Sequence, residues 1–459
     1  MKSATILPTP AIECGLRGLS GVAACEVEGG PEFDQKSKRW VVRLTLRRST
    51  CAEFVGISTQ WCLLLDTNYP FGRVSFFPAA EGGLTVTFPH QSRNTPSREG
   101  FGWRNGKLCL DLPFGCERRA ERERDPVGDA EQRLRWNAER AIQWLNRAAE
   151  NQLRSDGDPF EVPERPYTTD RAWGRVRVVH DESAAMLSVW NGRAEGFGFV
   201  KFGVITEIAN VIAVSTLEDQ DGCPFRMWSG RELGKLGEQW HVHGFWWLWP
   251  QPVVARPWHA PGTWGELRQI ADEMGVDSDE MLQWLFPILR GTRNIGILMV
   301  GYPVPTHIGA AASEVHWDAL LLPRLEKAEG QPNGFRANAL GWWHRDRCGK
   351  FGDNVPLEYL IVDNWNCDRL QARGRLPTGM RDKHVALLGV GALGSILAEM
   401  LVRAGLKSIA LFDADVLTAG NICRHTATLV DVGKGKVVTV AQRLRQISPS
   451  VRVPPFLSP

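Results

Sequence analysis

The sequence lacks a strong excess of charge of either sign. Its 54 lysine and arginine residues nearly balance its 52 aspartate and glutamate residues, which leaves a formal net charge of +2. A nearly neutral chain does not present the basic surface by which proteins hold nucleic acid or anionic lipid. We therefore expect neither a nucleic acid nor a membrane among its partners.

Long apolar runs and paired cysteines are also missing. No run approaches the ~20 apolar residues of a membrane-spanning helix, and the N-terminal MKSATILPTPAIECG is too polar and too rich in proline for a signal peptide. The ten cysteines are scattered and form no C-x-x-C pair. The sequence therefore predicts no metal site and a reduced, cytoplasmic compartment.

The first block of the chain, residues 1–160, is predicted to be an α+β domain. Alternating apolar and polar residues around positions 40–46, 61–65 and 74–77 are typical of strands in an antiparallel meander. Asp129 is a good helix N-cap. The helix after it is predicted to bury one apolar face, formed by Leu134, Ala138, Ala141, Leu145 and Ala148.

Two further blocks follow a stretch rich in proline, aspartate and glycine at residues 155–166, which is predicted to be a linker. The middle block, 167–375, mixes strand-like runs with a helix at 265–274 and is predicted to be α/β. The last block, 380–459, has the order strand, glycine turn, helix, strand, loop and helix of a partial Rossmann-like unit. The predicted fold is thus multidomain, with α+β and α/β parts.

The last block contains a glycine-rich turn. Gly389, Gly391 and Gly394 form G-x-G-x-x-G between a strand at 384–388, predicted to be buried and parallel, and a helix. Such glycines let a phosphate approach the backbone N–H groups at a helix start, and an acidic residue ending the next strand, here Asp413, reaches a ribose hydroxyl. These features alone fit an NAD-dependent oxidoreductase equally well.

The residues after the second strand indicate which nucleotide binds. The segment LFDADVLTAGNICRHT resembles the adenylation signature of the ThiF/MoeB and ubiquitin-activating superfamily. The resemblance implies binding of ATP with Mg²⁺. It assigns nucleotide-site roles, beyond the three glycines, to Asp413, Asp415, Asn421, Arg424 and Lys436. Arginine and lysine suit this reaction because they neutralise charge as a carboxylate meets the α-phosphate.

The resemblance covers only the N-terminal part of an activating domain. In the resembled family, a later Mg²⁺-binding aspartate and a catalytic cysteine lie beyond the point that corresponds to residue 459. The 459-residue chain is therefore expected to catalyse negligible adenylation alone, and a pyrophosphate-exchange assay tests this expectation.

Two stretches of the first block resemble ubiquitin-conjugating enzymes. Residues 69–76, YPFGRVSF, resemble that family's Tyr-Pro turn, and residues 105–112, NGKLCLDL, resemble the segment with the acceptor cysteine. The resemblance implies that Cys109 accepts an acyl group as a thioester and that Asn94 is a candidate donor to the oxyanion. The order Pro89-His90-Gln91 departs from the family's His-Pro-Asn, and we expect His90 to tie down the loop before the cysteine.

The other cysteines of the first block are weaker candidates. Buried packing is the commoner fate of a lone cysteine, and we expect it for Cys62, Cys14, Cys25 and Cys51. Cys116 is a rival to Cys109 without a family pattern around it.

The middle block resembles a degenerate, inactive adenylation domain, chiefly around GYPVP at 301–305 and VHWDAL at 315–320. His241 and His243 alternate along a predicted strand. With no third ligand near in sequence, a packed or hydrogen-bonded pair is favoured over a metal site. We expect this block to have a structural or substrate-docking role.

The order of the three blocks resembles the fused enzyme of CBASS-type anti-phage systems. That resemblance implies ATP-dependent activation of a protein's C-terminal carboxylate and transfer through Cys109 to an amine, with a cGAS-like nucleotidyltransferase as the protein activated; homodimers are common in the resembled family. Three alternatives stay open: conjugation of a bacterial ubiquitin-like protein, an NAD-dependent oxidoreductase, and a non-catalytic scaffold.

Overall fold

The computed structural model describes residues 7–97, 100–110, 125–169, 172–193, 196–205, 208, 210–228, 233–236, 241–292, 294–448 and 450–454. Contacts divide the chain into two compact units. The first comprises Met1–Arg165, Val254–Pro261 and Thr306–Ala310, and the second comprises the remainder. Within the described ranges, no helix is both long enough and apolar enough to cross a membrane.

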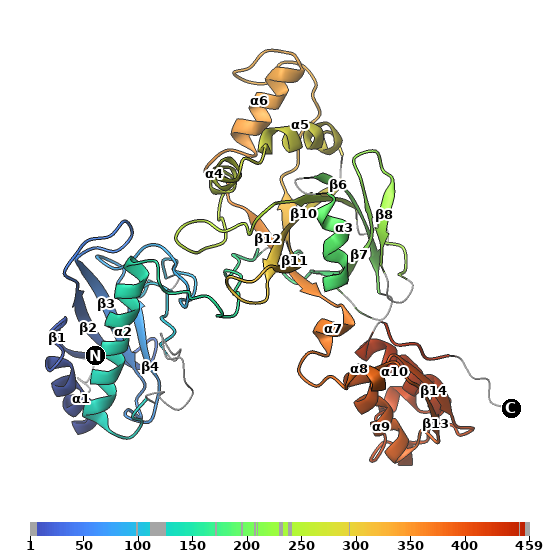
Figure 1. Cartoon of the computed structure of the whole chain (residues 1–459), viewed down its shortest axis with the longest axis horizontal. Helices are drawn as coiled ribbons and strands as arrows, with labels where there is room; N and C mark the ends of the chain where they lie inside the picture. Colours follow the sequence, from blue (N-terminus) through green and yellow to red (C-terminus); the bar gives the residue numbers. More distant parts are fainter. Residues whose placement is uncertain are drawn as a thin grey trace, which may run out of the picture. The chain divides into compact units, whose positions relative to one another are not determined.

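The first unit is an antiparallel meander covered on one face by two helices (Figure 1). Its strands pair in the order β1-β2-β3-β4, and the three expected strands are confirmed. The elements are α1 (Pro10–Ser20), β1 (Cys25–Asp34), β2 (Arg39–Arg47), β3 (Ser58–Leu65), β4 (Val74–Pro78) and α2 (Ala130–Ala149).

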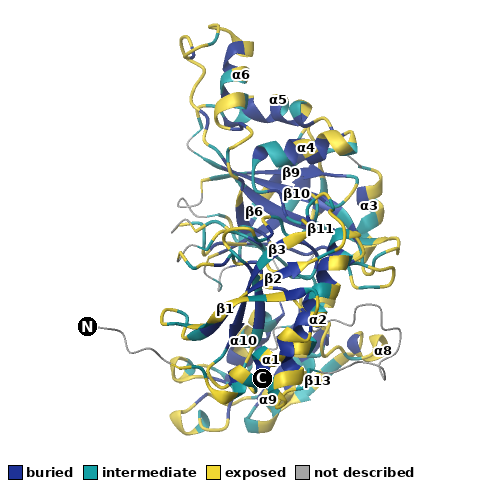
Figure 2. Cartoon of the chain, turned by 90° about the vertical axis from the view of Figure 1, so that its left-hand side faces the viewer, coloured by how far each residue is buried: buried dark blue, intermediate teal, exposed yellow. Residues whose placement is uncertain are grey.

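Helix α2 supplies the core of this unit. The Asp129 carboxylate accepts a hydrogen bond from the Gln132 N–H and caps the helix, as the sequence predicts. All five residues of the predicted apolar face are buried. Between the helix and the sheet, Trp144 makes edge-to-face contacts with Trp61 and Phe88, with ring centroids 6.3 and 5.6 Å apart. In Figure 2 the sheet and the inner side of α2 form one buried layer.

The predicted linker at 155–166 contains no regular helix or strand, yet it packs within the first unit. The Arg93 N–H donates to the Glu164 carboxylate at 3.0 Å, and the Phe160 ring lies 6.0 Å from that of Trp258. Trp258 belongs to residues 254–261, a segment from the middle of the sequence that also joins this unit.

The second unit begins with a mixed sheet of eight strands in the order β5-β12-β11-β10-β9-β6-β7-β8. In addition, β5, the first strand of this order, pairs with β7, the last strand but one. The strands are β5 (Arg177–His180), β6 (Phe197–Val204), β7 (Val211–Glu218), β8 (Pro224–Met227), β9 (Val242–Leu248), β10 (Ile295–Pro305), β11 (Ala312–Leu322) and β12 (Glu358–Asn364).

The resemblance to an inactive adenylation domain implies an open sheet of mainly parallel strands, and the observed sheet differs from that. Only the β9–β10, β5–β12 and β5–β7 pairs are parallel. The cause is local, because β6 and β7, and likewise β10 and β11, are sequence neighbours joined by short loops, and short loops produce antiparallel pairs. The accompanying helices are η2 (Ala184–Met186), α3 (Leu187–Asn191), α4 (Trp264–Met274), α5 (Ser278–Leu289) and α6 (Ala339–Gly349).

The C-terminal part of the second unit is a two-stranded parallel sheet with helices packed against it. Its elements are α7 (Cys367–Leu370), α8 (Thr378–Arg381), β13 (His384–Leu388), α9 (Ala392–Arg403), β14 (Ser408–Phe412), η3 (Ala419–Asn421), η4 (Leu429–Asp431) and α10 (Lys436–Ile447). The parallel pairing of β13 and β14 is confirmed, but the expectation that β13 is buried is wrong. His384, Ala386 and Leu388 are exposed, because β14 is its one neighbouring strand among the described residues.

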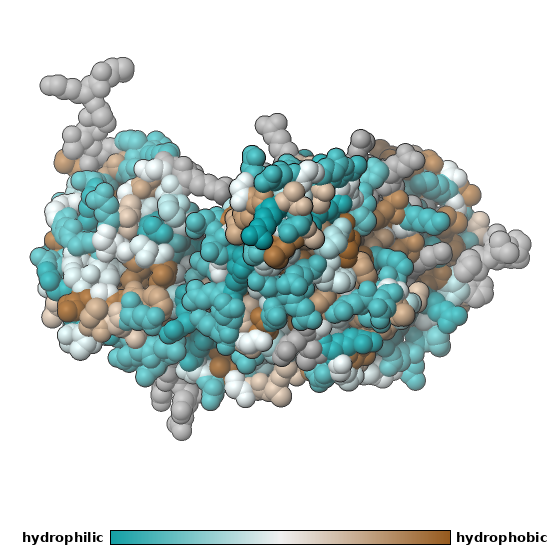
Figure 3. All heavy atoms as spheres, turned by 90° about the horizontal axis from the view of Figure 1, so that it is seen from above, coloured by the Kyte–Doolittle hydropathy of each residue, from teal (hydrophilic) through white to brown (hydrophobic). Residues whose placement is uncertain are grey.

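Exposed large apolar side chains are most frequent in the C-terminal part, where they include Leu388, Leu393, Met400, Leu429 and Val430. The face drawn in Figure 3 is mostly hydrophilic, with apolar residues in small patches between charged ones. Single exposed apolar residues are ordinary for globular proteins, whose surfaces always include apolar atoms.

Candidate functional site

Cys109 lies on a short extended segment that is held on both sides by main-chain hydrogen bonds. The Leu108 N–H donates to the Phe76 carbonyl at 3.0 Å, and the Cys109 N–H donates to the His90 carbonyl at 2.9 Å. Leu108 and Leu110 are buried, and Cys109 between them is exposed. Side chains alternate along extended backbone, so burying the two leucines turns the thiol outward.

His90 holds the Cys109 segment through its main chain. Its φ of 58° places it in the left-handed region that few non-glycine residues adopt, which turns its carbonyl to the Cys109 N–H. Its ring is largely buried, and the Nδ1 atom lies 3.8 Å from the Glu161 carboxylate. This geometry matches the structural role expected for His90.

Asn94 is buried beside the same segment, and its amide is fully engaged. The Nδ2 atom donates to the carbonyls of Leu84 and Val86 at 2.7 and 2.9 Å, and Oδ1 accepts from the Arg104 Nε at 2.9 Å. An amide has two N–H donors, and both are used here. Its role as an oxyanion donor stays a prediction, and that role requires the side chain to release one carbonyl.

Arg104, which the sequence analysis did not single out, joins the Asn94 loop to the Cys109 segment. Besides the Asn94 side chain, its guanidinium donates to the Asn94 carbonyl at 3.1 Å, and burial lowers its pKa from the ordinary value. On the other side, Gly106 packs so closely that an added Cβ would lie 2.8 Å from the Asn94 amide. One arginine in a chain with 54 basic residues gives no sequence signal of such a role.

The remaining cysteines of the first unit divide by burial. Cys25 and Cys62 are buried, as expected, and burial raises the pKa of each thiol to about 11. Cys14 is half-buried. Cys51 is exposed, so the expectation of a packed side chain is wrong there, because it lies in a loop after β2. Cys116, the predicted rival, lies outside the described residues.

The glycine turn of the C-terminal part has the geometry that a phosphate site needs. Gly389 adopts a φ of +83°, and Gly391 caps α9. An added Cβ at either position would meet no atom within 4 Å, so the backbone here is open to a ligand. At Gly394 an added Cβ would lie 1.9 Å from the Gly389 carbonyl oxygen, so only glycine fits there.

Asp413 lies at the end of β14 against this turn. One carboxylate oxygen accepts from the Val390 N–H at 2.8 Å, and the other accepts from the Asp415 N–H at 2.9 Å. A carboxylate has about four acceptor sites, so these bonds leave capacity for a ribose hydroxyl. The structure thus brings together Asp413 and the glycine turn.

Lys436 and Asp415 form an ion pair. The Lys436 Nζ lies 2.6 Å from the Asp415 carboxylate, with the lysine largely buried and 71% of the aspartate side chain exposed. The Lys436 main-chain N–H also donates to the Asp415 carbonyl at 3.0 Å. The sequence signature assigns both residues to one site, and in the structure they are in contact although 21 positions separate them in the chain.

Asn421 and Arg424 share the loop that follows β14. The Asn421 Oδ1 accepts from the Thr418 N–H at 2.9 Å, closing the capping box of η3. Arg424 is exposed, and its guanidinium donates to the Gly420 carbonyl at 3.4 Å. An exposed guanidinium on a short loop can move toward an anion at small cost in contacts.

These residues fit a nucleotide better than a metal ion alone. The open backbone at Gly389 and Gly391, the start of α9 and two cationic side chains suit phosphates. Among the described residues, no group of three or more histidine, cysteine or acidic side chains could hold a metal ion. A magnesium ion bound with the phosphates would help to neutralise their charge.

The middle part has a polar cluster inside its core. The Glu182 carboxylate is fully buried and accepts from the indole N–H groups of Trp190 and Trp317 at 3.1 and 3.4 Å. Burial raises the pKa of Glu182. Beside it, burial lowers the pKa of His180 to about 3. Because side chains of the fold itself supply these hydrogen-bond partners, we interpret the cluster as structural.

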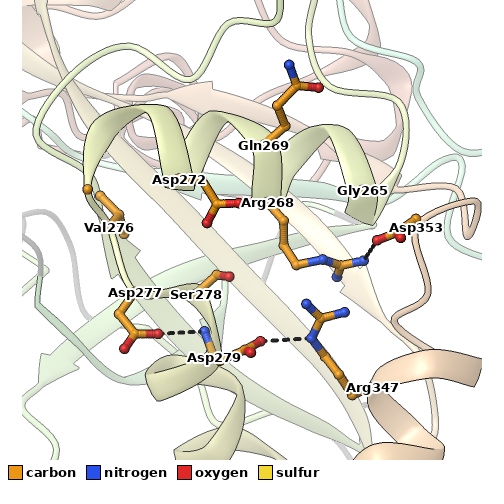
Figure 4. Close-up of a pocket in the computed structure, with 11 residues that line it drawn as sticks. Gly265, Arg268, Gln269, Asp272, Val276, Asp277, Ser278, Asp279, Arg347 and Asp353 are labelled. Atoms are coloured by element: carbon orange, nitrogen blue, oxygen red, sulfur yellow. Dashed lines mark hydrogen bonds and ion pairs between the residues drawn. The ribbon is translucent and has the colours of Figure 1, made fainter.

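A polar hollow of about 840 Å³ lies between α4, α5, the end of α6 and the loop that carries Asp353 (Figure 4). Its two arginines already have partners: Arg268 pairs with Asp353, and the Arg347 Nε lies 2.8 Å from Asp279. Elsewhere in the middle part, the His243 ring is hydrogen-bonded, as expected, to Thr292 and Asn294. A substrate-docking role for this part stays a prediction.

Two family models match separate parts of the chain. Residues 151–365 match the Cap2 central linker domain, and residues 375–458 match the ThiF family. The ATP-dependent ubiquitin transferase-like protein Cap2 of Enterobacter hormaechei subsp. hoffmannii (strain UCI 50) is 27% identical over 427 residues. The alignment covers 91% of this chain and 69% of that protein.

Other relatives match a smaller share of the chain. Ubiquitin-like modifier-activating enzyme 5 of Drosophila pseudoobscura pseudoobscura is 38% identical over 98 residues, which cover 20% of this chain and 25% of that protein. The crystal structure of the E. coli tRNA threonylcarbamoyladenosine dehydratase TcdA in complex with AMP is 39% identical, covering 16% of this chain and 31% of its own, with a TM-score of 0.16. The chain thus spans a quarter to a third of these two relatives.

Proposed function

We propose that this chain, a Cap2-like ThiF fusion and a ubiquitin-activating and -conjugating type of enzyme, binds ATP at its glycine turn for the activation of a protein's C-terminal carboxylate and carries the acyl group on Cys109. One observation supports the proposal most. The chain that holds the ThiF glycine turn also presents an exposed thiol between two buried leucines, on a segment resembling the acceptor site of conjugating enzymes.

The activation half rests on the residues around the glycine turn. ATP, when bound, supplies the adenylyl group that makes a carboxylate reactive. Gly389 and Gly391 give phosphates access to the backbone, while Asp413 holds the turn through the Val390 N–H. Lys436 is fixed by its ion pair with Asp415, so its charge is already in position and requires little reorganisation.

The transfer half assigns two steps to Cys109. Its thiolate attacks the acyl carbon of an incoming thioester, a new carbon–sulfur bond forms, and the donor thiol leaves. An amine then attacks the Cys109 thioester, an amide forms, and the Cys109 thiolate departs and regains a proton. The segment's two main-chain hydrogen bonds hold the sulfur while both steps take place.

The substrate proposed is a cGAS-like nucleotidyltransferase, and the setting proposed is antiviral defence of the CBASS type. The resemblance across the three blocks and the likeness to Cap2 over 91% of the chain support this choice. The same chemistry would serve a bacterial ubiquitin-like protein, since both substrates offer a free C-terminal carboxylate. Residence in the cytoplasm and a homodimer are part of the same proposal.

The transfer half can be tested without an activating reaction. A cGAS-like nucleotidyltransferase carrying a C-terminal mercaptoethanesulfonate thioester is mixed with the chain, and adducts are separated on non-reducing gels. We expect an adduct that dithiothreitol cleaves, that Cys109→Ala abolishes, and that Cys109→Ser converts to a dithiothreitol-resistant ester. Cys51→Ala is the matched control, because Cys51 is the other exposed cysteine described in the first unit. An adduct surviving in Cys109→Ala, or none in the parent chain, refutes the role of Cys109 and favours a scaffold.

The activation half needs a separate measurement. Equilibrium dialysis with radiolabelled ATP and Mg²⁺, and with radiolabelled NAD in parallel, separates an adenylating site from a dinucleotide site. We expect binding of ATP and not of NAD, and the reverse result would restore the oxidoreductase alternative.

A further inference from the structure

The glycine turn is held by a histidine to which the sequence assigned no role. His425 is buried, and it follows Arg424 directly in the loop after β14. Its Nε2 atom lies 2.7 Å from the Val390 carbonyl oxygen, and its Nδ1 atom accepts from the Ala427 N–H at 3.0 Å. Val390 is the residue between the first two glycines of the turn.

The hydrogen-bond partners of this ring indicate its tautomer. Because Nδ1 accepts a hydrogen bond from a main-chain N–H, it carries a lone pair and no proton. A neutral imidazole then has its proton on Nε2, where it donates to the Val390 carbonyl. His425 therefore bridges the turn and its own loop and uses both ring nitrogens within the fold.

Val390 is consequently held at both of its main-chain groups. Its N–H donates to Asp413 at 2.8 Å, and its carbonyl accepts from His425. The two flanking glycines have few steric restraints of their own. A turn with such freedom keeps one conformation only if something fixes it, and these two side chains contribute to this together with the Gly389 N–H, which donates to the Phe412 carbonyl at 2.7 Å.

The same loop is also attached to helix α9. The Thr426 N–H donates to the Oγ of Ser395, a fully buried residue in the first turns of that helix, at 3.4 Å. The loop carrying Asn421 and Arg424 is thereby tied to the glycine turn through His425 and to the helix through Thr426.

We infer that His425 is a positioning residue for the nucleotide site: it fixes the phosphate-facing turn and couples the turn to the loop of Asn421 and Arg424. This inference rests on the proposed function, since it assumes that the turn binds ATP. The His425 ring itself touches only protein atoms in the contacts described above, so its effect on a ligand passes through Val390.

The two hydrogen bonds of His425 determine which substitutions test the inference. Glutamine carries one amide donor group and one carbonyl acceptor, so His425→Gln can donate to Val390 and accept from Ala427. His425→Leu fills similar space without either hydrogen bond. His384→Leu removes an exposed histidine from the same part of the chain and serves as the control.

Two measurements test the inference on the full 459-residue chain. The first is the dissociation constant for ATP with Mg²⁺, and the second is amide hydrogen exchange of residues 388–394 without nucleotide. We expect His425→Leu to weaken ATP binding about tenfold, a change of about 1.4 kcal/mol, and to speed exchange in the turn. His425→Gln restores most of both, and His384→Leu changes neither.

The outcomes separate this inference from the proposed function. Parent-like ATP binding and exchange in a folded His425→Leu overturn the positioning role. A His425→Gln variant as impaired as His425→Leu assigns the effect to packing and also overturns it. If the parent chain binds no ATP, the proposed function fails, whereas exchange in the turn still decides whether His425 fixes Val390. Circular dichroism and thermal unfolding identify a variant that fails to fold, and His425→Gln then carries the test.

Discussion

Replacing Gly394 by alanine is expected to weaken nucleotide binding strongly by displacing the glycine turn. The added Cβ would lie 1.9 Å from the Gly389 carbonyl oxygen, and ordinary contact begins at 3.4 Å, so the two must move apart by about 1.5 Å. The obstacle is main chain, which cannot rotate aside as a side chain can. The turn and the start of α9 therefore have to separate.

The size of the effect follows from that displacement. A misplacement of about 1 Å in a binding site can cost on the order of 100-fold. We therefore expect Gly394→Ala to weaken ATP binding at least about 100-fold, or about 2.8 kcal/mol. The loss should appear with some loss of stability, because the overlap exists without nucleotide.

Gly391→Ala gives the contrasting case. No atom lies within 4 Å of the added Cβ, and the φ of −74° suits any residue, so the fold should keep its stability. The methyl group would nevertheless occupy space at the open backbone where phosphates are proposed to lie. We expect weaker ATP binding at an unchanged unfolding temperature.

Binding of radiolabelled ATP and thermal unfolding, measured on the same preparations, test both variants. Gly379→Ala in α8 is the control, since its added Cβ also meets nothing within 4 Å and it lies outside the proposed site. If Gly394→Ala binds ATP within about threefold of the parent, a difference of about 0.6 kcal/mol, the turn is not the phosphate site and the reasoning fails.

Three further predictions follow from charge and burial. Near pH 8, iodoacetamide should label Cys109 well before Cys62, because a pKa of about 11 leaves roughly one in a thousand Cys62 thiols ionised; equal rates by peptide mass spectrometry would contradict this. Stability should fall as pH drops from about 6.5 toward 3, because burial lowers the pKa of His180 to about 3 and the unfolded chain binds a proton that the folded chain excludes. His180→Gln should reduce that slope in urea unfolding series, and an unchanged slope would refute the assignment. Lys436→Met should weaken ATP binding about tenfold at nearly unchanged stability, with Lys434→Met as the exposed control; equal effects would exclude a specific role for Lys436.

Local features were the predictable part of the fold. The Asp129 cap and the apolar face of α2 follow from side chains three and four positions apart, and β13 and β14 follow from short apolar runs bounded by turns. The degree of burial of β13, which proved to be exposed, was not predictable in this way. An apolar run does not show how many strands or helices lie beside it. The mixed sheet of the middle part was missed for the same reason.

Contacts between distant segments were the unpredictable part of the thiol site. The Trp258 N–H donates to the Thr87 carbonyl at 3.1 Å, and the Thr87 hydroxyl accepts from the Asn94 N–H at 2.9 Å. A segment more than 160 positions away thus supports the loop before Cys109. No periodicity or motif in either segment indicates this contact, so the full engagement of Asn94 could be seen only in three dimensions.

The nucleotide site was more predictable because its spacing is fixed by covalent geometry. Gly394 has to be glycine because the chain returns here to within van der Waals distance of the start of the turn. The G-x-G-x-x-G motif reflects this requirement. The acidic and basic residues of the signature were likewise found together, as in the pair of Asp415 and Lys436. The role of His425 was hidden because hydrogen bonding to a main-chain carbonyl leaves no mark in one sequence.

Both candidate sites hold their working group through neighbours that do no chemistry themselves. Cys109 is exposed because its segment is fixed by the carbonyls of Phe76 and His90, and the glycine turn is open because Val390 is fixed by Asp413 and His425. A site fixed before its ligand arrives loses less conformational entropy when the ligand binds. Substitutions at the holding residues should therefore reduce activity more than their small contact area would suggest, and they should do so while the fold persists.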